Sequence, residues 1–229
     1  MQVMTEGVTV FIVDDDPAMR ESMSFLVRSV GVAVETYPSA QTFLDDYDPI
    51  RSGCLVLDVR MPGMSGLELQ ELLADRDVRL PVIMITGYGD VPMAVRALQG
   101  GAIAFLEKPF TDQELLEQIN LGIEADRQRR VREAELARIS ELISRLTPRE
   151  RQVMDLVYEG KANKAIGAEL GINHKTVEVH RSRVMAKLQV SSLAALLRII
   201  LAYRMSATEP LHTNPPPGSR GGPSGQSLT

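Results

Sequence analysis

Acidic residues stand directly after two short apolar runs in the first half of this chain. Val8–Val13 is followed by Asp14 and Asp15, and Cys54–Leu57 is followed by Asp58. Short apolar runs of this kind are typical of strands buried on both faces of a parallel sheet. Because ligands of open α/β sheets lie outside the carboxyl ends of the strands, we expect the three acids to meet in one crevice. Clustered carboxylates repel one another, which predicts a bound divalent cation, and Mg²⁺ suits oxygen ligands.

Two further polar residues follow later apolar runs. Thr86 comes directly after the run 81–85, and Lys108 stands two positions after the run 103–106. With a metal bound, Asp58 can act as a carboxylate nucleophile toward a phosphoryl group. Lys108 would then pair with the phosphoryl oxygens, and Thr86 would donate a hydrogen bond to them. Any one of these residues alone is more often a cap or a solvated charge, but together they indicate a site.

Strand and helix patterns alternate five times within the first 120 or so residues, which predicts right-handed βαβ units on a doubly wound parallel sheet. The expected strands are 8–13, 32–36, 54–58, 81–85 and 103–106, and the expected helices are 17–30, 39–47, 67–74, 91–99 and one from 112 onward. Ser39 and Asp90 are suited to cap the second and fourth helices. In the fourth helix, Ala94, Ala97 and Leu98 should be buried, whereas Val91 and Val95 should face outward.

The helix that begins at Asp112 meets no Pro or Gly after Gly122. A straight helix over 126–145 would span roughly 30 Å. This segment is either a charged, solvated connector or a helical arm that transmits a signal or dimerises. Thr147 then offers an N-cap, with Pro at the first helical position and the capping-box acid Glu150 three residues later.

Four short helices follow, over 148–159, 163–170, 174–188 and 193–205, which predicts a small all-α domain. The second and third surround a turn that contains Gly171, as in a helix-turn-helix. In the third helix, Val177, Val184 and Leu188 share the face expected to pack inward. Residues expected to contact DNA are Lys175, Thr176, Glu178, Val179, Arg181, Ser182, Arg183 and Lys187. Exposed Val179 would suit the methyl group of thymine.

Charge is divided unevenly along the chain. Residues 1–125 hold 8 Lys/Arg and 20 Asp/Glu, a net charge of −12, whereas residues 126–229 hold 17 and 10, a net charge of +7. An acidic half followed by a basic half predicts two domains, the second with a polyanionic partner. Cys54 is the only cysteine, so a disulfide within the chain is excluded. Residues 1–7 do not read as a signal peptide and no apolar stretch is long enough to span a membrane, which predicts a cytoplasmic protein. The Pro- and Gly-rich tail 206–229 is expected to be disordered.

The motifs of the first half resemble the receiver domain of two-component response regulators. They are Val13–Asp15, Leu57–Gly66, Ile85–Gly87 and Phe105–Phe110. The resemblance implies a flavodoxin-like (βα)5 fold and phosphorylation of Asp58 by a sensor histidine kinase. It also implies Mg²⁺ held by Asp15, Asp58 and the backbone carbonyl of Arg60, with Asp14 acting through water. Thr86 and the aromatic ring of Phe105 would move together on phosphorylation, and Pro109 would follow a cis peptide bond.

The second half resembles the LuxR/NarL/FixJ helix-turn-helix in Leu146–Met154, Gly160–Ile166 and Lys175–Leu188. The family usually has Ser at 162 and Glu at 165, where this chain has Ala at both positions. Gly87–Val95 narrows the resemblance to FixJ-like regulators. We therefore expect a receiver over 8–124, a helical linker over 125–145, a DNA-binding domain over 146–205 and a disordered tail.

The predicted function is that of a phosphorylation-dependent transcriptional regulator rather than an enzyme. The phosphorylated receiver is expected to form a homodimer through Val91 and Val95 and so to control binding to double-stranded DNA, with RNA polymerase as a possible further partner. One alternative is a DNA-binding regulator that works without phosphorylation. Another is a phosphatase with an aspartyl-phosphate intermediate, for which Asp14–Pro17 lacks the expected Asp-x-Asp-x-Thr/Val arrangement.

Overall fold

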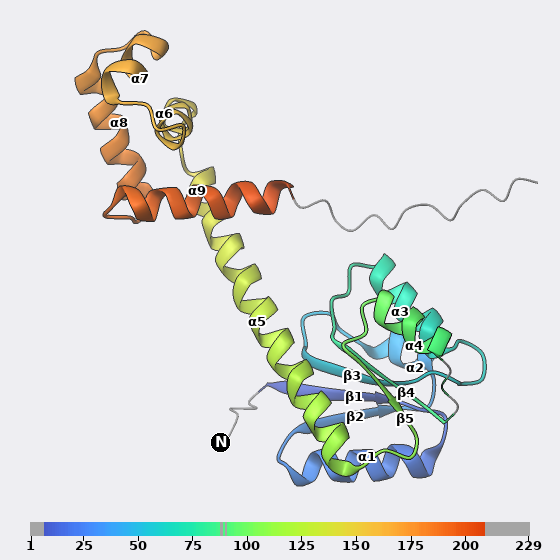
Figure 1. Ribbon diagram of the computed structural model, residues 1–229. Coiled ribbons are helices and arrows are strands. Elements are labelled where there is room, and N and C mark those ends of the chain that lie inside the picture. The colour runs from blue at the N-terminus through green and yellow to red at the C-terminus, as the bar shows by residue number, and fades with distance from the viewer. Residues whose placement is uncertain (1–6, 88, 90, 209–229) are drawn as a thin grey trace, which may run out of the picture. The chain divides into compact units, whose positions relative to one another are not determined.

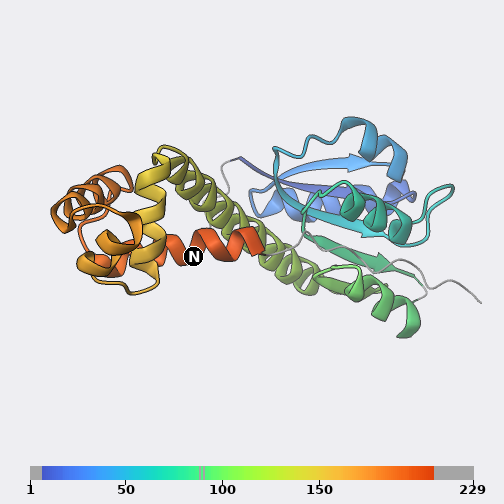
Figure 2. The same cartoon turned by 90° about the horizontal axis from the view of Figure 1, so that it is seen from above.

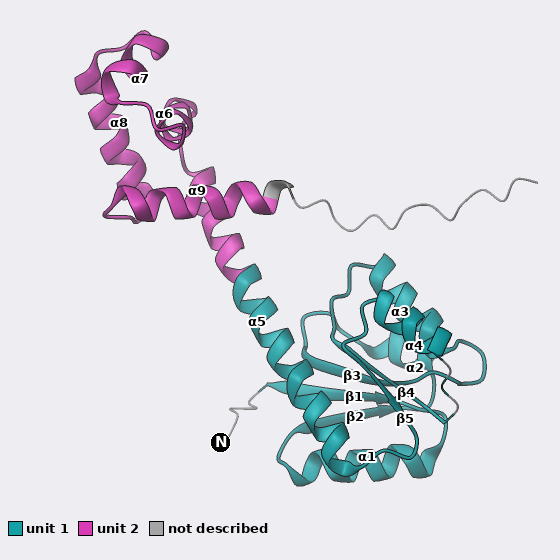
Figure 3. Cartoon of the chain, in the orientation of Figure 1, with its two compact units in different colours: residues 1–133 teal, residues 134–229 magenta. Residues whose placement is uncertain are grey.

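The computed structural model of the chain describes residues 7–87, 89 and 91–208. The chain divides into two compact units, residues 1–133 and 134–229 (Figure 3). The predicted cap Asp90 lies outside the described residues. So does most of the predicted tail 206–229, whose residues 206–208 instead end a helix. No described helix combines the length and the apolar character needed to cross a bilayer.

The first unit is built on a five-stranded parallel sheet, which confirms the predicted α/β architecture (Figure 1). The strands lie in the order β2-β1-β3-β4-β5, so the chain winds outward in both directions from β1 and β3. Their bounds are β1 Val8–Val13, β2 Ala33–Tyr37, β3 Ser52–Asp58, β4 Val82–Thr86 and β5 Ala104–Glu107. The register pairs Val13 with Leu57 and Asp58 with Ile85, so the carboxyl ends of the central strands meet at one edge.

Helices cover both faces of this sheet (Figures 1 and 2). They are α1 Pro17–Ser29, α2 Ala40–Asp46, α3 Gly66–Asp75, α4 Val91–Gln99 and α5 Asp112–Ser144. One core cluster joins the sheet to α2, α3 and α4, and a second joins it to α1 and α5. Cys54 lies in the second cluster and is completely buried, and burial raises the pKa of its thiol to about 12.

Local signals in the sequence explain where most helices begin. Asp16 caps α1 ahead of Pro17, and capping boxes open α2 at Ser39 and α3 at Ser65. Such caps satisfy backbone N–H groups that have no partner within the helix. The predicted start of α5 is likewise reinforced by Thr111, whose hydroxyl accepts from the backbone N–H of Glu114.

The second unit contains α6 Pro148–Tyr158, α7 Asn163–Leu170, α8 His174–Lys187 and α9 Leu193–Thr208. Thr147 forms the predicted capping box, and Gly171 ends α7 in the left-handed conformation with φ 66°. Ile139, Leu142 and Ile143, at the end of α5, belong to the same buried core as α6–α9. The segment predicted as a linker is therefore part of α5. The first part of this helix packs into the core of the first unit, and its last part packs into the core of the second unit.

Candidate functional site

Lys108 joins two buried carboxylates at the carboxyl edge of the sheet. Its ammonium Nζ lies 2.7 Å from Oδ1 of Asp58 and 2.8 Å from Oδ2 of Asp14. The two acids end or directly follow β3 and β1, and Lys108 follows β5. Residues separated by up to 94 positions in the chain thus meet in one polar crevice, as the strand ends predicted.

The charges in this crevice are unequal. Burial raises the pKa of Asp58, the nearby charge of Asp14 raises it further, and the hydrogen bond and charge of Lys108 only partly oppose this rise. Burial alone would lower the pKa of Lys108, but its hydrogen bonds to the two carboxylates leave that pKa raised. One cation therefore faces two carboxylates, and a further positive charge bound in this site would be stabilised by them.

The remaining predicted metal ligands lie around this pair. Asp15 is exposed, and the backbone N–H of Arg60 donates to Oδ2 of Asp58 at 2.7 Å. Within the described part of the chain, no three Asp, Glu, His or Cys side chains are gathered into a metal-binding cluster. The expected gathering of three acids is thus not seen, since Lys108 lies between two of them and Asp15 faces solvent. The two buried acids, Asp14 and Asp58, nevertheless supply carboxylate oxygens, which are the ligands that a hard divalent cation prefers.

The loop that follows Asp58 folds back closely on it. Gly66 donates its backbone N–H to the carbonyl of Val59 at 3.0 Å. A Cβ at position 66 would lie 2.3 Å from the carbonyl oxygen of Asp58, so a side chain there would collide with the backbone. This close approach explains the glycine at the start of α3 and places the start of that helix against the end of β3.

Thr86 and Phe105, the two predicted switch residues, lie on neighbouring strands. Thr86 is completely buried at the end of β4, and its carbonyl accepts from the backbone N–H of Lys108 at 2.7 Å. A Cβ at position 89 would lie 3.0 Å from the Phe105 ring and 3.2 Å from the methyl group of Thr86, so these two side chains leave no room for a larger residue there. The peptide bond between Lys108 and Pro109 is cis.

Helix α4 presents more apolar surface than the sequence predicted. Val91 and Val95 are exposed, at 77% and 44%, and Ala97 is buried as expected. The prediction that Leu98 is buried is wrong, because its side chain is 51% exposed. Met93 packs against the core in its place, so the inward face of α4 runs through Met93 and Ala97, four residues apart.

In the second unit, α8 presents most of the residues predicted to contact DNA. Val177, Val184 and Leu188 are buried, which confirms the predicted inward face. On the outside, the exposed members of the predicted set are Lys175, Thr176, Glu178, Val179, Ser182 and Arg183.

The other two predicted DNA contacts already have partners within the unit. Arg181 donates from Nη1 to Oδ1 of Asn163 at 2.6 Å, and both residues line a shallow groove between α7 and α8. The ammonium of Lys187 lies 2.6 Å from Oε2 of buried Glu150. Lys187 thus has a partner inside its own unit, and releasing it toward DNA would leave a buried carboxylate without its cation.

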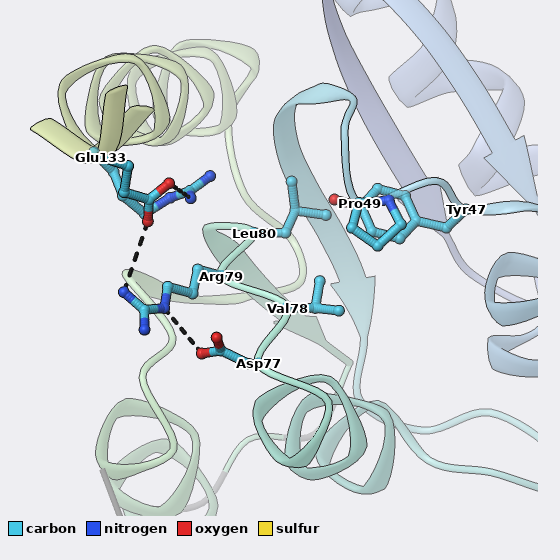
Figure 4. Close-up of a pocket in the computed structure, with 8 residues that line it drawn as sticks. Tyr47, Pro49, Asp77, Val78, Arg79, Leu80 and Glu133 are labelled. Atoms are coloured by element: carbon cyan, nitrogen blue, oxygen red, sulfur yellow. Dashed lines mark hydrogen bonds and ion pairs between the residues drawn. The ribbon is translucent and has the colours of Figure 1, made fainter. Parts of the chain in front are cut away.

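A separate pocket of about 380 Å³ contains none of the predicted site residues (Figure 4). Arg79, one of its lining residues, pairs with Asp77 at 3.0 Å and with Glu133 at 3.6 Å. The other residues that line the pocket are Tyr47, Pro49, Val78, Leu80 and Arg129. The pairing leaves the guanidinium of Arg79 with its charge already balanced.

Sequence reasoning missed two polar contacts. Arg20 donates to the carbonyl of Asp14 at 2.6 Å and so fastens the turn that carries the acids to α1. Asp126, a carboxylate of α5, is completely buried against the amino end of β3. The only sign of this contact in the sequence was the pair of arginines at positions 129 and 130, three and four residues after Asp126. This spacing predicts ion pairs along a helix, but it does not predict that Asp126 is buried.

Comparison with known proteins assigns both units. Residues 10–120 match the family model described as "Response regulator receiver domain", and residues 144–200 match "Bacterial regulatory proteins, luxR family". The chain is 47% identical over 198 residues to Nodulation protein W of Bradyrhizobium diazoefficiens, which covers 86% of this chain and 87% of that protein. It is 44% identical over 198 residues to the transcriptional regulatory protein FixJ of Azorhizobium caulinodans, with 86% and 94% covered.

Solved structures give the same assignment. The response regulator StyR is 48% identical with a TM-score of 0.79, and the match covers 86% of this chain and all of that one. Full-length FixJ from B. japonicum is 40% identical with a TM-score of 0.53, covering 88% and 99%. Receiver domains typically bind Mg²⁺ for phosphorylation and act with a histidine kinase, and the helix-turn-helix implies DNA binding. The chain thus belongs to the FixJ-like two-component response regulators with a LuxR-type DNA-binding domain, and it is a transcriptional regulator rather than an enzyme.

Proposed function

We propose that Asp58 accepts a phosphoryl group from a sensor histidine kinase and that this modification controls DNA binding by α8. The observation that carries the proposal is the position of Lys108 between Asp58 and Asp14, at 2.7 and 2.8 Å. A lysine held there can form charge-assisted hydrogen bonds with a phosphoryl group on Asp58 without a long side-chain movement.

The other receiver residues have separate proposed roles around Asp58. Asp14, Asp15, Asp58 and the backbone carbonyl of Arg60 would hold Mg²⁺, which supplies charge neutralisation during phosphoryl transfer. Thr86, buried at the end of the neighbouring strand, would donate a hydrogen bond to the phosphoryl group. Burial, with the neighbouring charge of Asp14, leaves the pKa of Asp58 raised, so a bound cation would favour the charged carboxylate.

Labelling with acetyl phosphate and Mg²⁺ tests the phosphoacceptor. Wild type should take up one phosphoryl group per chain by intact mass, and Asp58→Asn should take up none. Asp75→Asn, an exposed acid on α3, is the matched control and should label like wild type. Labelling of Asp58→Asn at normal stoichiometry would show that another residue is the acceptor. Catalytic release of phosphate from small esters would favour the phosphatase alternative.

Dimerisation through α4 is the proposed link between modification and DNA binding. Movement of Thr86 toward the phosphoryl group would open space for the Phe105 ring, which lies on the neighbouring strand β5. To move a two-state equilibrium from 1:99 to 99:1, phosphorylation must favour the active state by about 5.5 kcal/mol. The surface that becomes available would include exposed Val91 and Val95.

Substitution of Val95 tests this surface. Val95→Asp should label normally but sediment as a monomer, because a charge would be buried in the dimer. Phe25→Asp, on exposed α1, places the same charge on another apolar position and should still dimerise when phosphorylated. If phosphorylated Val95→Asp dimerises like wild type, the interface lies elsewhere. Contact with RNA polymerase stays a prediction to which we assign no surface.

The proposed DNA face of α8 comprises Lys175, Thr176, Glu178, Val179, Arg181, Ser182 and Arg183. Arg183→Ala should weaken binding, and if the guanidinium reads guanine the loss is about 1–3 kcal/mol at one base position. A uniform loss with a shallower salt dependence would indicate a phosphate contact instead. Arg198→Ala removes the same charge from exposed α9 and should leave base preference unchanged. Unchanged affinity of Arg183→Ala would exclude it from the interface.

A further inference from the structure

Asp126 on α5 is a buried carboxylate that takes no part in the acidic crevice. It has no exposed surface. Its Oδ2 accepts from the hydroxyl of Ser52 at 2.7 Å and from the backbone N–H of Gly53 at 3.0 Å. These two donors lie at the beginning of β3, the strand whose far end carries Asp58. One central strand therefore connects the phosphoacceptor to a fixed point on α5.

Two arginines of α5 complete this cluster. Arg129 pairs with Oδ1 of Asp126, and Nε of Arg130 lies 2.8 Å from Oδ2. Arg130 also donates to the backbone carbonyl of Ile50 at 2.8 Å and to that of Arg51. One guanidinium thus holds both the carboxylate and the loop that leads into β3. We call Ser52, Gly53, Asp126, Arg129 and Arg130 the α5 clamp.

The Asp126 carboxylate at the centre of the clamp is surrounded by donors, although Nε of Arg129 is buried without a hydrogen-bond partner. Burial would raise the pKa of Asp126, but the hydrogen bonds from Ser52, Arg129 and Arg130 leave it lowered. A buried carboxylate is tolerated when such partners surround it, and it then fixes the geometry of the elements that supply them. Leu115, Ile119 and Ile123 already attach α5 to the sheet through apolar contacts. The clamp adds a polar, directional attachment one turn further along the helix.

This position is where α5 leaves the receiver core. Beyond Glu133 the helix belongs to the second unit, and Ile139, Leu142 and Ile143 enter the core of that unit. A rearrangement inside the receiver can be passed along the chain to the second unit only through α5. Such transmission requires that the part of α5 packed on the receiver sheet move together with the sheet and not shift relative to it.

We propose that Asp126 is a positioning residue that couples the receiver to the DNA-binding domain by fixing the root of α5 to β3. The inference rests on the proposed function, because it concerns how phosphorylation of Asp58 reaches α8. It differs from a mechanism in which dimerisation alone brings two DNA-binding domains together. That mechanism needs no directional attachment of α5 and would survive loss of the clamp.

Asp126→Asn tests the coupling in the full-length protein. It keeps the size of the side chain but removes the charge that pairs with Arg129 and Arg130. Glu124→Gln is the matched control, since it removes the same charge two residues earlier from a surface pair with Arg127. Each variant is labelled with acetyl phosphate and Mg²⁺. Its affinity for a DNA duplex selected from a random library on phosphorylated wild type is then measured with and without phosphorylation.

We expect Asp126→Asn to label like wild type and to bind DNA normally when unmodified. Its gain in DNA affinity on phosphorylation should fall by about five-fold or more, on the scale of ordinary couplings between sites. Glu124→Gln should keep the full gain. A merely structural role would lower labelling and unmodified binding together, which separates the two explanations.

Arg130→Met provides a second variant in case Asp126→Asn does not fold. It leaves the carboxylate its bonds to Ser52, Gly53 and Arg129 but frees the loop before β3. If either variant labels normally and keeps the wild-type gain, the coupling role is excluded. Loss of labelling in both would also overturn it, because the clamp would then serve the receiver fold. Absence of any gain in wild type would instead refute the proposed function, and this inference would fall with it.

Discussion

Two lysine–carboxylate sites in this protein use the same groups in opposite ways. In the receiver, Lys108 lies between two buried acids, Asp14 and Asp58. In the second unit, Lys187 pairs with one buried acid, Glu150, which also accepts from the backbone N–H of Thr147. The first site has more negative than positive charge, and the second is balanced.

The difference appears in the pKa values of the two acids. Burial acts to raise the pKa of both acids. At Glu150 the hydrogen bonds from Lys187 and Thr147 outweigh this effect, so the net pKa of Glu150 is lowered. At Asp58 burial and the neighbouring Asp14 prevail, and the pKa is raised. A carboxylate left short of partners is suited to receive a ligand or a covalent group, whereas a fully partnered one holds structure. We use this contrast to order the following predictions.

The largest change in stability is expected at the balanced site. Glu150→Gln should lower the stability of the second unit by roughly 1–3 kcal/mol, because it removes the charge-assisted bond to Lys187 and weakens the capping box of α6. Partial exposure of Lys187 limits the loss. Hydrogen exchange of the amides in α6 and α8 measures it, and phosphorylation of the receiver should be unaffected. Unchanged exchange would show that the pair contributes no stability.

Acid should reproduce part of that loss. Since the folded-state pKa of Glu150 is lowered, its contribution is present above the ordinary Glu pKa of 4.5 and is lost as the pH falls through the lowered value. Exchange protection of α6 should therefore weaken below about pH 4.5 in wild type. The corresponding pH dependence should be smaller in Glu150→Gln, and equal dependence in the two proteins would assign the acid sensitivity to other groups.

A smaller effect is expected from the lysine of the same pair. Lys187→Met should destabilise the second unit by about 1 kcal/mol, because Glu150 keeps its bonds to Thr147 and can be partly solvated or protonated. Base preference in DNA binding should not change, since the ammonium of Lys187 is already paired with buried Glu150. A loss of discrimination at one base pair would return Lys187 to the DNA-contacting face.

The smallest change in stability is expected at the unbalanced site. Asp58→Asn removes one of two acids that repel each other but also one partner of Lys108, so the two effects offset. Thermal unfolding of the receiver should shift by no more than the equivalent of about 1 kcal/mol in either direction. A loss as large as that of Glu150→Gln would mean that the crevice is a structural ion pair.

Local patterns allowed much of this molecule to be predicted. Apolar runs that end in acids gave the strands and the crevice, and Ser39, Thr147 and Gly171 marked helix ends by rules that act within a few residues. The contact between Lys108 and Asp58 followed from sheet topology, since parallel strands bring their carboxyl ends together.

Features that depend on long-range packing could not be predicted. Leu98 and Met93 are five residues apart, about 140° around α4. Only the position of the helix on the sheet decides which of them packs against the core. In the sequence, Lys187 is one of several basic residues of α8. Only the structure shows that it pairs with Glu150, 37 positions earlier. The burial of Asp126 likewise depends on the first two residues of β3, which are 73 and 74 positions away.

The buried thiol of Cys54 makes the receiver measurable on its own. It is the only cysteine in the chain, it has no exposed surface, and its pKa is about 12. A thiol reagent can therefore modify the protein only during openings of β3 that expose this side chain. Because the second unit has no cysteine, the rate of modification reports receiver openings even while the DNA-binding domain is folded, unfolded or bound. The wild-type protein thus carries a built-in probe of how phosphorylation alters the strand that bears Asp58.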